Sequence, residues 1–249
     1  MSLPLFGDKL NLDSLVKPES YIDYLKSRGV ELPQLPSKVI LSMSNRMGQK
    51  WIKENLKMES RRAIGLNFAI NNDYALVTGL GVGASVHTIN LEEMIVLGAR
   101  EFFLVGIAGA LDPELHPGDV VVLDKAYRDE GASRHYLAES EIVKANGEMV
   151  EEVSTRLQAE GLLKKVGATW TVDCPYRETR AEVLHFRSRG VLAVEMEASA
   201  LYAVTESKKL RAVATVVISD VLDPNNWQPH FYHKDLAKTY HSVLTALTR

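Results

Sequence analysis

Short runs that are apolar at nearly every position recur along this sequence of 249 residues, and stretches with helical patterning separate them. Three examples are residues 101–106 (EFFLVG), 119–123 (DVVVL) and 211–219 (RAVATVVIS). A strand that is apolar on both faces needs cover on both faces, which is the situation of a parallel strand between two layers of helices. We therefore expect an α/β protein with a mostly parallel sheet covered on both sides.

The same patterning predicts the order of the elements. Residues 1–37 are polar and punctuated by prolines, so we expect an arm that packs on the body, with residues 38–249 as a single domain. In the helix expected at 85–98, the apolar side carries Ile89, Met94 and Leu97. Strands are expected at 38–43, 64–69, 74–78, 101–106, 119–123, 164–172, 191–194 and 211–219, and helices at 19–28, 46–56, 85–98, 147–159, 180–188 and 233–247.

Composition excludes several classes of protein. The chain is 46% hydrophobic with a formal net charge of −3 and no basic stripe, so we expect no nucleic-acid partner. Its one cysteine, Cys174, excludes a disulfide framework, and the histidines show no ligand spacing, so we expect no metal. There is no apolar run of 18 residues and no signal-peptide pattern at the start, so we expect a cytoplasmic protein without a membrane partner.

Residues 190–202 (GVLAVEMEASALY) predict a buried strand that leads directly into a helix, with Glu195, Met196 and Glu197 at the junction. Acidic residues in the first turn of a helix are favourable because the helix N-terminus carries partial positive charge. The junction of a strand and a helix is also where α/β proteins bind ligands, and carboxylates there can accept hydrogen bonds from sugar hydroxyls. The segment alone leaves both interpretations open.

A glycine-rich turn at 79–85 (GLGVGAS) joins an expected strand to an expected helix. Its backbone N–H groups can approach an anion at the helix N-terminus, but a tight structural turn explains the glycines equally well. A second glycine-containing loop is expected at 106–109 (GIAG), with the same two interpretations.

Asp220 follows the apolar strand 211–219. A partly desolvated carboxyl at the end of a strand can act as a general acid, although an aspartate there can also cap the following turn, VLDPNN. Two loops, 128–136 (RDEGASRHY) and 171–179 (TVDCPYRET), are dense in polar and aromatic groups. Such loops are either functional or simply solvated.

These segments and their order resemble the nucleoside phosphorylase family, which includes purine nucleoside phosphorylases, uridine phosphorylases and related nucleosidases. The resemblance covers about residues 38–248 and is carried by GLGVG-S, VGIAGAL…HPGDVVV, RDEGASRHY, VDCPYRET, GVLAVEMEASALYAV and VVISD. It implies a single three-layer α/β/α domain with a mixed central sheet. It also implies inorganic phosphate as co-substrate, no further cofactor, and a homo-oligomer (dimer or hexamer) whose active sites are completed by a neighbouring subunit.

The resemblance assigns expected roles residue by residue. Glu197 would hold the ribose hydroxyls, Met196 would pack on the ribose, and Asp220 would assist departure of a purine base. The catalytic pair would be Asp220 and Glu197. The base would meet Glu195, the backbone of Ala108 and Gly109, the loop residues Pro175, Tyr176 and Arg177, and His233, which falls about where purine-handling members carry an arginine that supports the acid.

The phosphate site departs from the family pattern. Three usual contacts are replaced by Gly48, Leu104 and Ile107. The remaining candidates for phosphate are Gly81, Gly83, Ser85, Arg46 and Arg62. We therefore expect phosphorolysis of a nucleoside, with a purine slightly favoured over uridine, and keep hydrolysis by water and non-catalytic nucleoside binding as alternatives.

Overall fold

A computed structural model gives the structure of the chain and describes residues 4–249. One mixed sheet of 11 strands forms its centre. The strands, in pairing order, are β11 (Asn226–Pro229), β10 (Arg211–Asp223), β6 (Val120–Asp129), β8 (Leu163–Val172), β9 (Ala193–Glu195), β5 (Glu101–Ala110), β1 (Lys38–Ser42), β4 (Tyr74–Thr78), β3 (Leu66–Ile70) and β2 (Arg61–Ala63), with β7 (Ile142–Lys144) beside β6.

Part of the sheet closes on itself. Strand β10 pairs with β6 on one side and with β5 on the other, so β10, β6, β8, β9 and β5 form a closed ring of strands. The two longest ladders, β5 with β10 and β6 with β8, are parallel, whereas β10 with β6 and β5 with β9 are antiparallel. The predicted fold class, a three-layer α/β/α domain with a mixed sheet, is confirmed.

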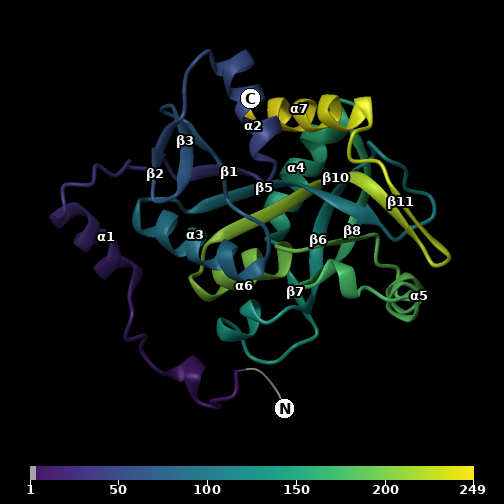
Figure 1. Ribbon diagram of the computed structural model, residues 1–249, viewed down its shortest axis with the longest axis horizontal. Coiled ribbons are helices and arrows are strands. Elements are labelled where there is room, and N and C mark those ends of the chain that lie inside the picture. Colours follow the sequence, from purple (N-terminus) through teal and green to yellow (C-terminus); the bar gives the residue numbers. More distant parts are fainter. Residues whose placement is uncertain (1–3) are drawn as a thin grey trace.

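Helices cover both faces of the sheet (Figure 1). Helices α3 (Ala84–Val96) and α6 (Ala198–Ser207) pack on one face with α1 (Pro18–Ser27) outside them, whereas α2 (Asn45–Trp51), α4 (Gly147–Ala159) and α7 (Lys234–Thr248) cover the other face. Helix α5 (Arg180–Ser188) packs on the ends of β8, β9 and β10 in a third apolar cluster. No helix of residues 4–249 is long and apolar enough to cross a membrane.

Some strands extend further than the sequence pattern predicts. Residues 106–109 are not a loop, because β5 continues through them to Ala110 between β9 and β10. A Cβ at Gly109 would lie 2.3 Å from Leu222 Cδ1, so glycine permits this close approach. Strand β10 runs past Asp220 and folds back as β11, a hairpin that the pattern did not predict.

One prediction for helix α3 is wrong. Ile89 is 58% exposed, although Met94 and Leu97 are buried as expected. The buried face of the helix instead passes through His87 and Leu91, which places Ile89 on the outer side.

The segment before β1 contacts the body through a few residues. Ile22 and Leu35 are buried, and the backbone N–H of Leu35 donates to the carbonyl of Leu97 at 2.8 Å. A domain boundary at residue 37 stays a prediction.

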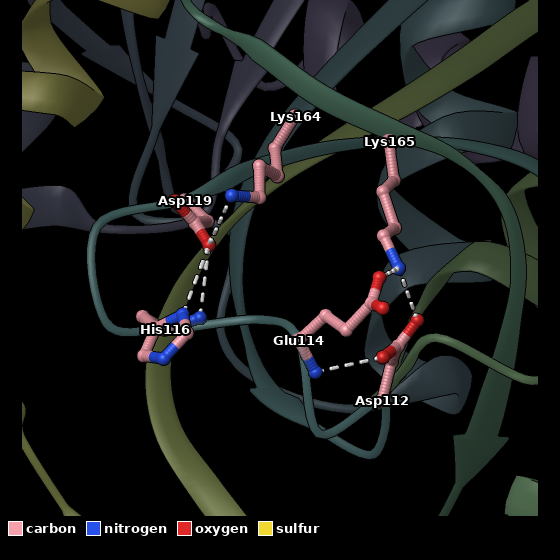
Figure 2. Close-up of polar contacts among 6 residues, drawn as sticks. All are labelled: Asp112, Glu114, His116, Asp119, Lys164 and Lys165. Carbon is pink, nitrogen blue, oxygen red and sulfur yellow. Dashed lines mark hydrogen bonds and ion pairs between the residues drawn. The ribbon is translucent and has the colours of Figure 1, made fainter.

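The HPGD motif forms the turn between β5 and β6 (Figure 2). Gly118 has a φ of +94°, and Asp119 accepts a hydrogen bond from the backbone N–H of His116 at 2.9 Å. Beside it, Lys165 on β8 pairs with Asp112 at 2.7 Å and with Glu114 at 2.6 Å, and these carboxylates raise the pKa of Lys165. Asp119 of the motif pairs with Lys164 of β8 at 4.0 Å. The motif therefore has a structural explanation, because Asp119, with Asp112 and Glu114, fastens the β5–β6 loop to β8.

Candidate active site

Glu195 ends β9 and caps the helix that follows. Its Oε2 accepts hydrogen bonds from the backbone N–H groups of Glu197 at 2.8 Å and Ala198 at 2.7 Å, and its Oε1 accepts one from the Thr171 hydroxyl at 2.5 Å. Burial raises the pKa of Glu195, while these donors oppose the rise. Both oxygens are thus engaged inside the protein, and a contact between Glu195 and a base stays a prediction.

Glu197 has a different environment two residues further on. It occupies the N-cap position of α6, is 7% exposed, and its Oε1 accepts a hydrogen bond from the backbone N–H of Gly83 at 2.6 Å. Burial and the neighbouring Glu195 raise the pKa of Glu197 to about 8. Glu197 therefore joins the β9–α6 junction to the glycine turn, as a buried carboxyl with few internal partners.

The glycine turn between β4 and α3 needs glycine for its backbone conformation. Gly81 and Gly83 have φ values of +76° and +103°, which side chains rarely adopt. Gly83 is the N-cap of α3, and no side chain among the described residues caps this helix. The first N–H groups of α3 therefore form the kind of helix N-terminus that can bind an anion, and the exposed Ser85 lies beside them. The Gly83 N–H is not free for an anion, because it already donates to Glu197.

Asp220 lies within β10, 7% exposed, next to Gly109 of β5. Its Oδ1 accepts a hydrogen bond from the Ser219 hydroxyl at 2.6 Å, and its Oδ2 accepts one from the Trp227 indole N–H at 2.8 Å. The alternative that Asp220 caps the following turn is wrong, because Asp223 accepts the N–H of Asn225 there.

The group that supports Asp220 differs from the one expected. His233 is the N-cap of α7, where its Nδ1 accepts the Asp235 N–H at 3.4 Å. Trp227 on β11 fills the supporting position next to Asp220 instead. In the sequence, Trp227 stands shortly after the turn residues DPNN, and this is the signal that could have suggested its role. Only the β10–β11 hairpin shows that the Trp227 side chain lies next to Asp220.

The loop 173–179 directs one residue inward. Pro175, Tyr176 and Arg177 form an exposed 3₁₀ turn, and Tyr176 is 97% exposed. Glu178 is the half-buried member of residues 173–180. Burial, the Asp220 carboxylate and Glu182 raise the pKa of Glu178 to about 7. Sequence reasoning missed this residue, since nothing in the pattern distinguishes it from its charged neighbours.

The loop 128–136 is anchored, not simply solvated. Arg128 is 2% exposed and donates to the Ser133 hydroxyl at 2.9 Å and to the carbonyls of Ala138 and Leu137. Glu130 is also buried and accepts the Ser199 hydroxyl of α6 at 2.8 Å. A cavity of about 380 Å³ lies between this loop and the glycine turn, lined by Lys9, Ser85, Thr88, Gly131, Ala132, His135 and Tyr136.

Other side chains occupy the two places, at Gly48 and Leu104, where the resemblance leads us to expect phosphate-binding arginines. A Cβ at Gly48 would lie 2.5 Å from Ser42 Oγ and 2.7 Å from Thr78 Cγ2, so no longer side chain fits there. Thr78 donates to Asn45 Oδ1 at 2.9 Å and accepts from Gln49 at 2.7 Å, which makes the network neutral. Leu104 is buried on β5, and Arg46 and Arg62 are exposed on α2 and β2. Among residues 4–249, neither arginine makes a hydrogen bond or ion pair with the glycine turn, so their part in binding phosphate stays a prediction.

Comparison with known proteins adds independent findings. The family described as the phosphorylase superfamily matches residues 59–249. A uridine phosphorylase of Haemophilus influenzae is 29% identical over 166 residues, and a purine nucleoside phosphorylase DeoD-type 1 of Shewanella oneidensis is 30% identical over 146 residues. These matches cover 60% and 58% of this chain, but 66% and 62% of the relatives, which is less than two thirds of their length.

The crystal structure of uridine phosphorylase from Vibrio fischeri ES114, complexed with 6-hydroxy-1-naphthoic acid, is similar with a TM-score of 0.71. The two chains are 21% identical, and the match covers 86% of this chain and 90% of the other. The fold is thus that of an α/β phosphorylase. With a family match over residues 59–249, the chain belongs to the phosphorylase superfamily.

Proposed function

We propose that this protein is a nucleoside phosphorylase, a pentosyltransferase that cleaves the N-glycosidic bond of a nucleoside with inorganic phosphate. The observation that carries the proposal is the position of Glu197, a buried carboxyl against Gly83 at the uncapped N-terminus of α3. Such a carboxyl can accept hydrogen bonds from ribose hydroxyls, while the adjacent helix N-terminus can attract an anion. The two substrates then meet at one place.

The residues divide by the part of the substrate that they contact. Glu197 holds the ribose hydroxyls with Met196 beside the sugar, and Glu195 fixes the start of α6. Asp220 stabilises the leaving base near Ala108 and Gly109, with Glu195, Pro175, Tyr176, Arg177 and His233 as further candidates around the base. Phosphate binds at Gly81, Gly83 and Ser85 together with Arg46, and a neighbouring subunit of a dimer or hexamer supplies Arg62.

Substrate choice follows from Asp220. A purine presents N7, which can receive a proton or a hydrogen bond as the glycosidic bond breaks, whereas uracil lacks it. We therefore place a purine nucleoside ahead of uridine. The relatives include proteins named for each, so the names do not decide between them.

Hydrolysis is the second candidate, and the packing around Gly48 favours it. Where the family has an arginine, Ser42 and Thr78 fill the space, and a neutral network of Asn45, Gln49 and Thr78 replaces positive charge. A phosphate dianion bound without several charged or backbone donors is held weakly.

A panel of purine nucleosides, uridine and their 2′-deoxy forms tests the proposal, with products separated by chromatography in buffers with and without phosphate. Release of base with ribose 1-phosphate supports a phosphorylase. Release of free ribose without phosphate supports hydrolysis, and intact nucleosides under both conditions exclude both activities.

A further inference from the structure

The β10–β11 hairpin places one aromatic side chain against Asp220. In the antiparallel ladder Asp220 lies opposite Pro229, and Leu222, two residues further on, lies opposite Trp227. Opposed residues and residues two apart project from the same face of a ladder, so these side chains share one face of the hairpin. Trp227 reaches diagonally across this face, and its indole N–H donates to Asp220 Oδ2 at 2.8 Å.

The same face of the hairpin packs on β5. A Cβ at Gly109 would lie 2.3 Å from Leu222 Cδ1 and 3.0 Å from Asp220 Oδ2. The oxygen that Trp227 holds is therefore the one that lies over Gly109. This is the part of β5 where we propose that the base binds.

Asp220 depends on two uncharged donors for its orientation. One is the Ser219 hydroxyl, whose single hydrogen is shared between Asp220 Oδ1 at 2.6 Å and the Ala108 carbonyl at 3.3 Å. The other is the Trp227 N–H, which within residues 4–249 donates to Asp220 alone. No charged side chain of that range makes a hydrogen bond or ion pair with Asp220. The orientation of the carboxyl group therefore depends chiefly on Trp227.

Trp227 is also the accessible tryptophan of the three in the chain. It is 54% exposed, whereas Trp51 and Trp170 are 2% and 0% exposed. Strand β11 is an edge strand with four exposed residues, and in the described part of the chain it pairs with β10 alone. Figure 1 shows the hairpin projecting beyond the rest of the sheet. The indole thus lies between the buried Asp220 carboxyl and solvent.

From this geometry we infer that Trp227 positions Asp220 for the leaving base, and that the base binds beside the indole ring. This rests on the proposed function, in which Asp220 contacts the base. A hydrogen bond that fixes one orientation of the carboxyl group before the base arrives avoids the cost of ordering it during the reaction. A base that is hydrogen-bonded to Asp220 lies next to the indole, where two flat aromatic surfaces can contact each other. Trp227 acts through Asp220 and is a positioning residue.

Kinetics of Trp227→Phe test the positioning, because this substitution removes the N–H and keeps an aromatic ring. Phe231→Leu is the matched control, since the Phe231 ring lies 6.1 Å from that of Trp227 and has no hydrogen-bonding group. For the nucleoside cleaved best, Trp227→Phe should lose ~10-fold or more in kcat, while KM for phosphate changes by less than about twofold. Phe231→Leu should keep both values. A Trp227→Phe protein that matches the control in kcat overturns the inference and leaves the proposed function standing.

The Asp220→Ala background separates positioning from packing. Because Trp227 acts through Asp220, Trp227→Phe should cost less than about twofold further in protein that already lacks the carboxyl group. Chromatography over long incubations measures base release by both Asp220→Ala proteins. An equal loss from Trp227→Phe in the two backgrounds overturns the positioning role.

Acrylamide quenching of tryptophan fluorescence tests contact with the base without turnover. Trp227→Phe should remove most of the quenchable emission, because Trp51 and Trp170 are buried. In the unmodified protein, the free base released from the best nucleoside should reduce quenching, whereas inorganic phosphate alone should not. Unchanged quenching at base concentrations that inhibit cleavage overturns the inference alone. An unmodified protein that cleaves no nucleoside overturns the proposed function and, with it, the role of Trp227.

Discussion

Glu195 and Glu197 show how two carboxyls of the same short segment acquire different tasks. Glu195 receives two backbone N–H groups of α6 and the Thr171 hydroxyl, whereas Glu197 receives the Gly83 N–H and lies next to the charge of Glu195. The first arrangement stabilises the fold, and the second leaves an oxygen for a ligand. The sequence motif VEME predicted that both glutamates belong to the site. Their different roles become visible only from their hydrogen-bond partners in the structure.

A pair of substitutions tests this division. Glu195→Gln places an amide where backbone donors point, and should lower the free energy of unfolding by about 1–3 kcal/mol. Glu197→Gln should fold as stably as the parent but lose about 10²-fold or more in kcat/KM, because an amide cannot become the carboxylate that accepts hydrogen bonds from both ribose hydroxyls. Urea unfolding and steady-state kinetics measure both effects. Full activity in Glu197→Gln would remove its assignment to the ribose.

The pKa of Glu197 adds a pH dependence. Because this pKa is raised to about 8, Glu197 is largely protonated at pH 7. A ribose diol donates hydrogen bonds and favours the carboxylate, so KM for the nucleoside should fall as pH rises from 7 to 9. Initial rates over that range measure this, and a KM that is flat or rises would contradict it.

His87 is a buried residue with a separate consequence for stability. Its ring is 0% exposed, and neither ring nitrogen has a hydrogen-bond partner in the described chain. Burial lowers its pKa to about 4, below the value of 6.5 in an unfolded chain. The unfolded state therefore binds the proton more readily, and stability is lost as pH falls from above 6.5 toward 4.

Between pH 7 and pH 5 this loss amounts to about 2 kcal/mol. His87→Leu should remove that part of the acid sensitivity, since leucine fills a similar space and does not titrate. Urea unfolding at both pH values measures the difference. Equal acid sensitivity in the parent and in His87→Leu would show that other groups cause the loss.

The local hydrophobic pattern predicts the bounds of several helices and strands well, but it does not predict how far the longer strands extend. Helices α4 and α5 and strand β4 have the bounds that their patterns indicate. The pattern for β5 ends at Gly106, and the patterns for β6 and β10 end just before Asp124 and Asp220. All three strands continue further, because pairing with neighbouring strands extends them. Strand β11 forms only because it pairs with β10, and this pairing is what places Trp227 next to Asp220. The hydrogen-bond partner of Asp220 could therefore not be predicted from the sequence.

The packing of helix α2 on the sheet at Gly48 can be tested by substitution. Helix α2 lies so near to β1 and β4 that a Cβ would meet Ser42 and Thr78 at 2.5 Å and 2.7 Å. Gly48→Ala should therefore destabilise the protein by about 1–3 kcal/mol. Gly147→Ala, in a helix where a Cβ meets nothing within 4 Å, is the matched control and should be neutral or stabilising. Equal thermal unfolding of the two variants would contradict this packing.

At the scale of the whole molecule, the N-terminal segment carries exposed apolar side chains. Leu5, Phe6, Leu12, Leu15 and Val16 are each at least 60% exposed. Clustered exposure of this kind is typical of an interface, which agrees with the homo-oligomer that we propose. Light scattering should give a particle mass that is a multiple of 27.7 kDa. Removal of residues 4–16 should reduce the number of subunits per particle. A particle of 27.7 kDa for the intact chain would contradict a shared active site.

The proposed phosphorolysis requires that a chain with an altered phosphate region still transfers ribose to phosphate. Titrating phosphate against base release from the best nucleoside, with the sugar product identified, tests it most directly. We expect ribose 1-phosphate as the product and a KM for phosphate above the ~1 mM that bounds most substrates, because Gly48 and Leu104 supply no charge. Release of free ribose at a rate that does not depend on phosphate would contradict the claim.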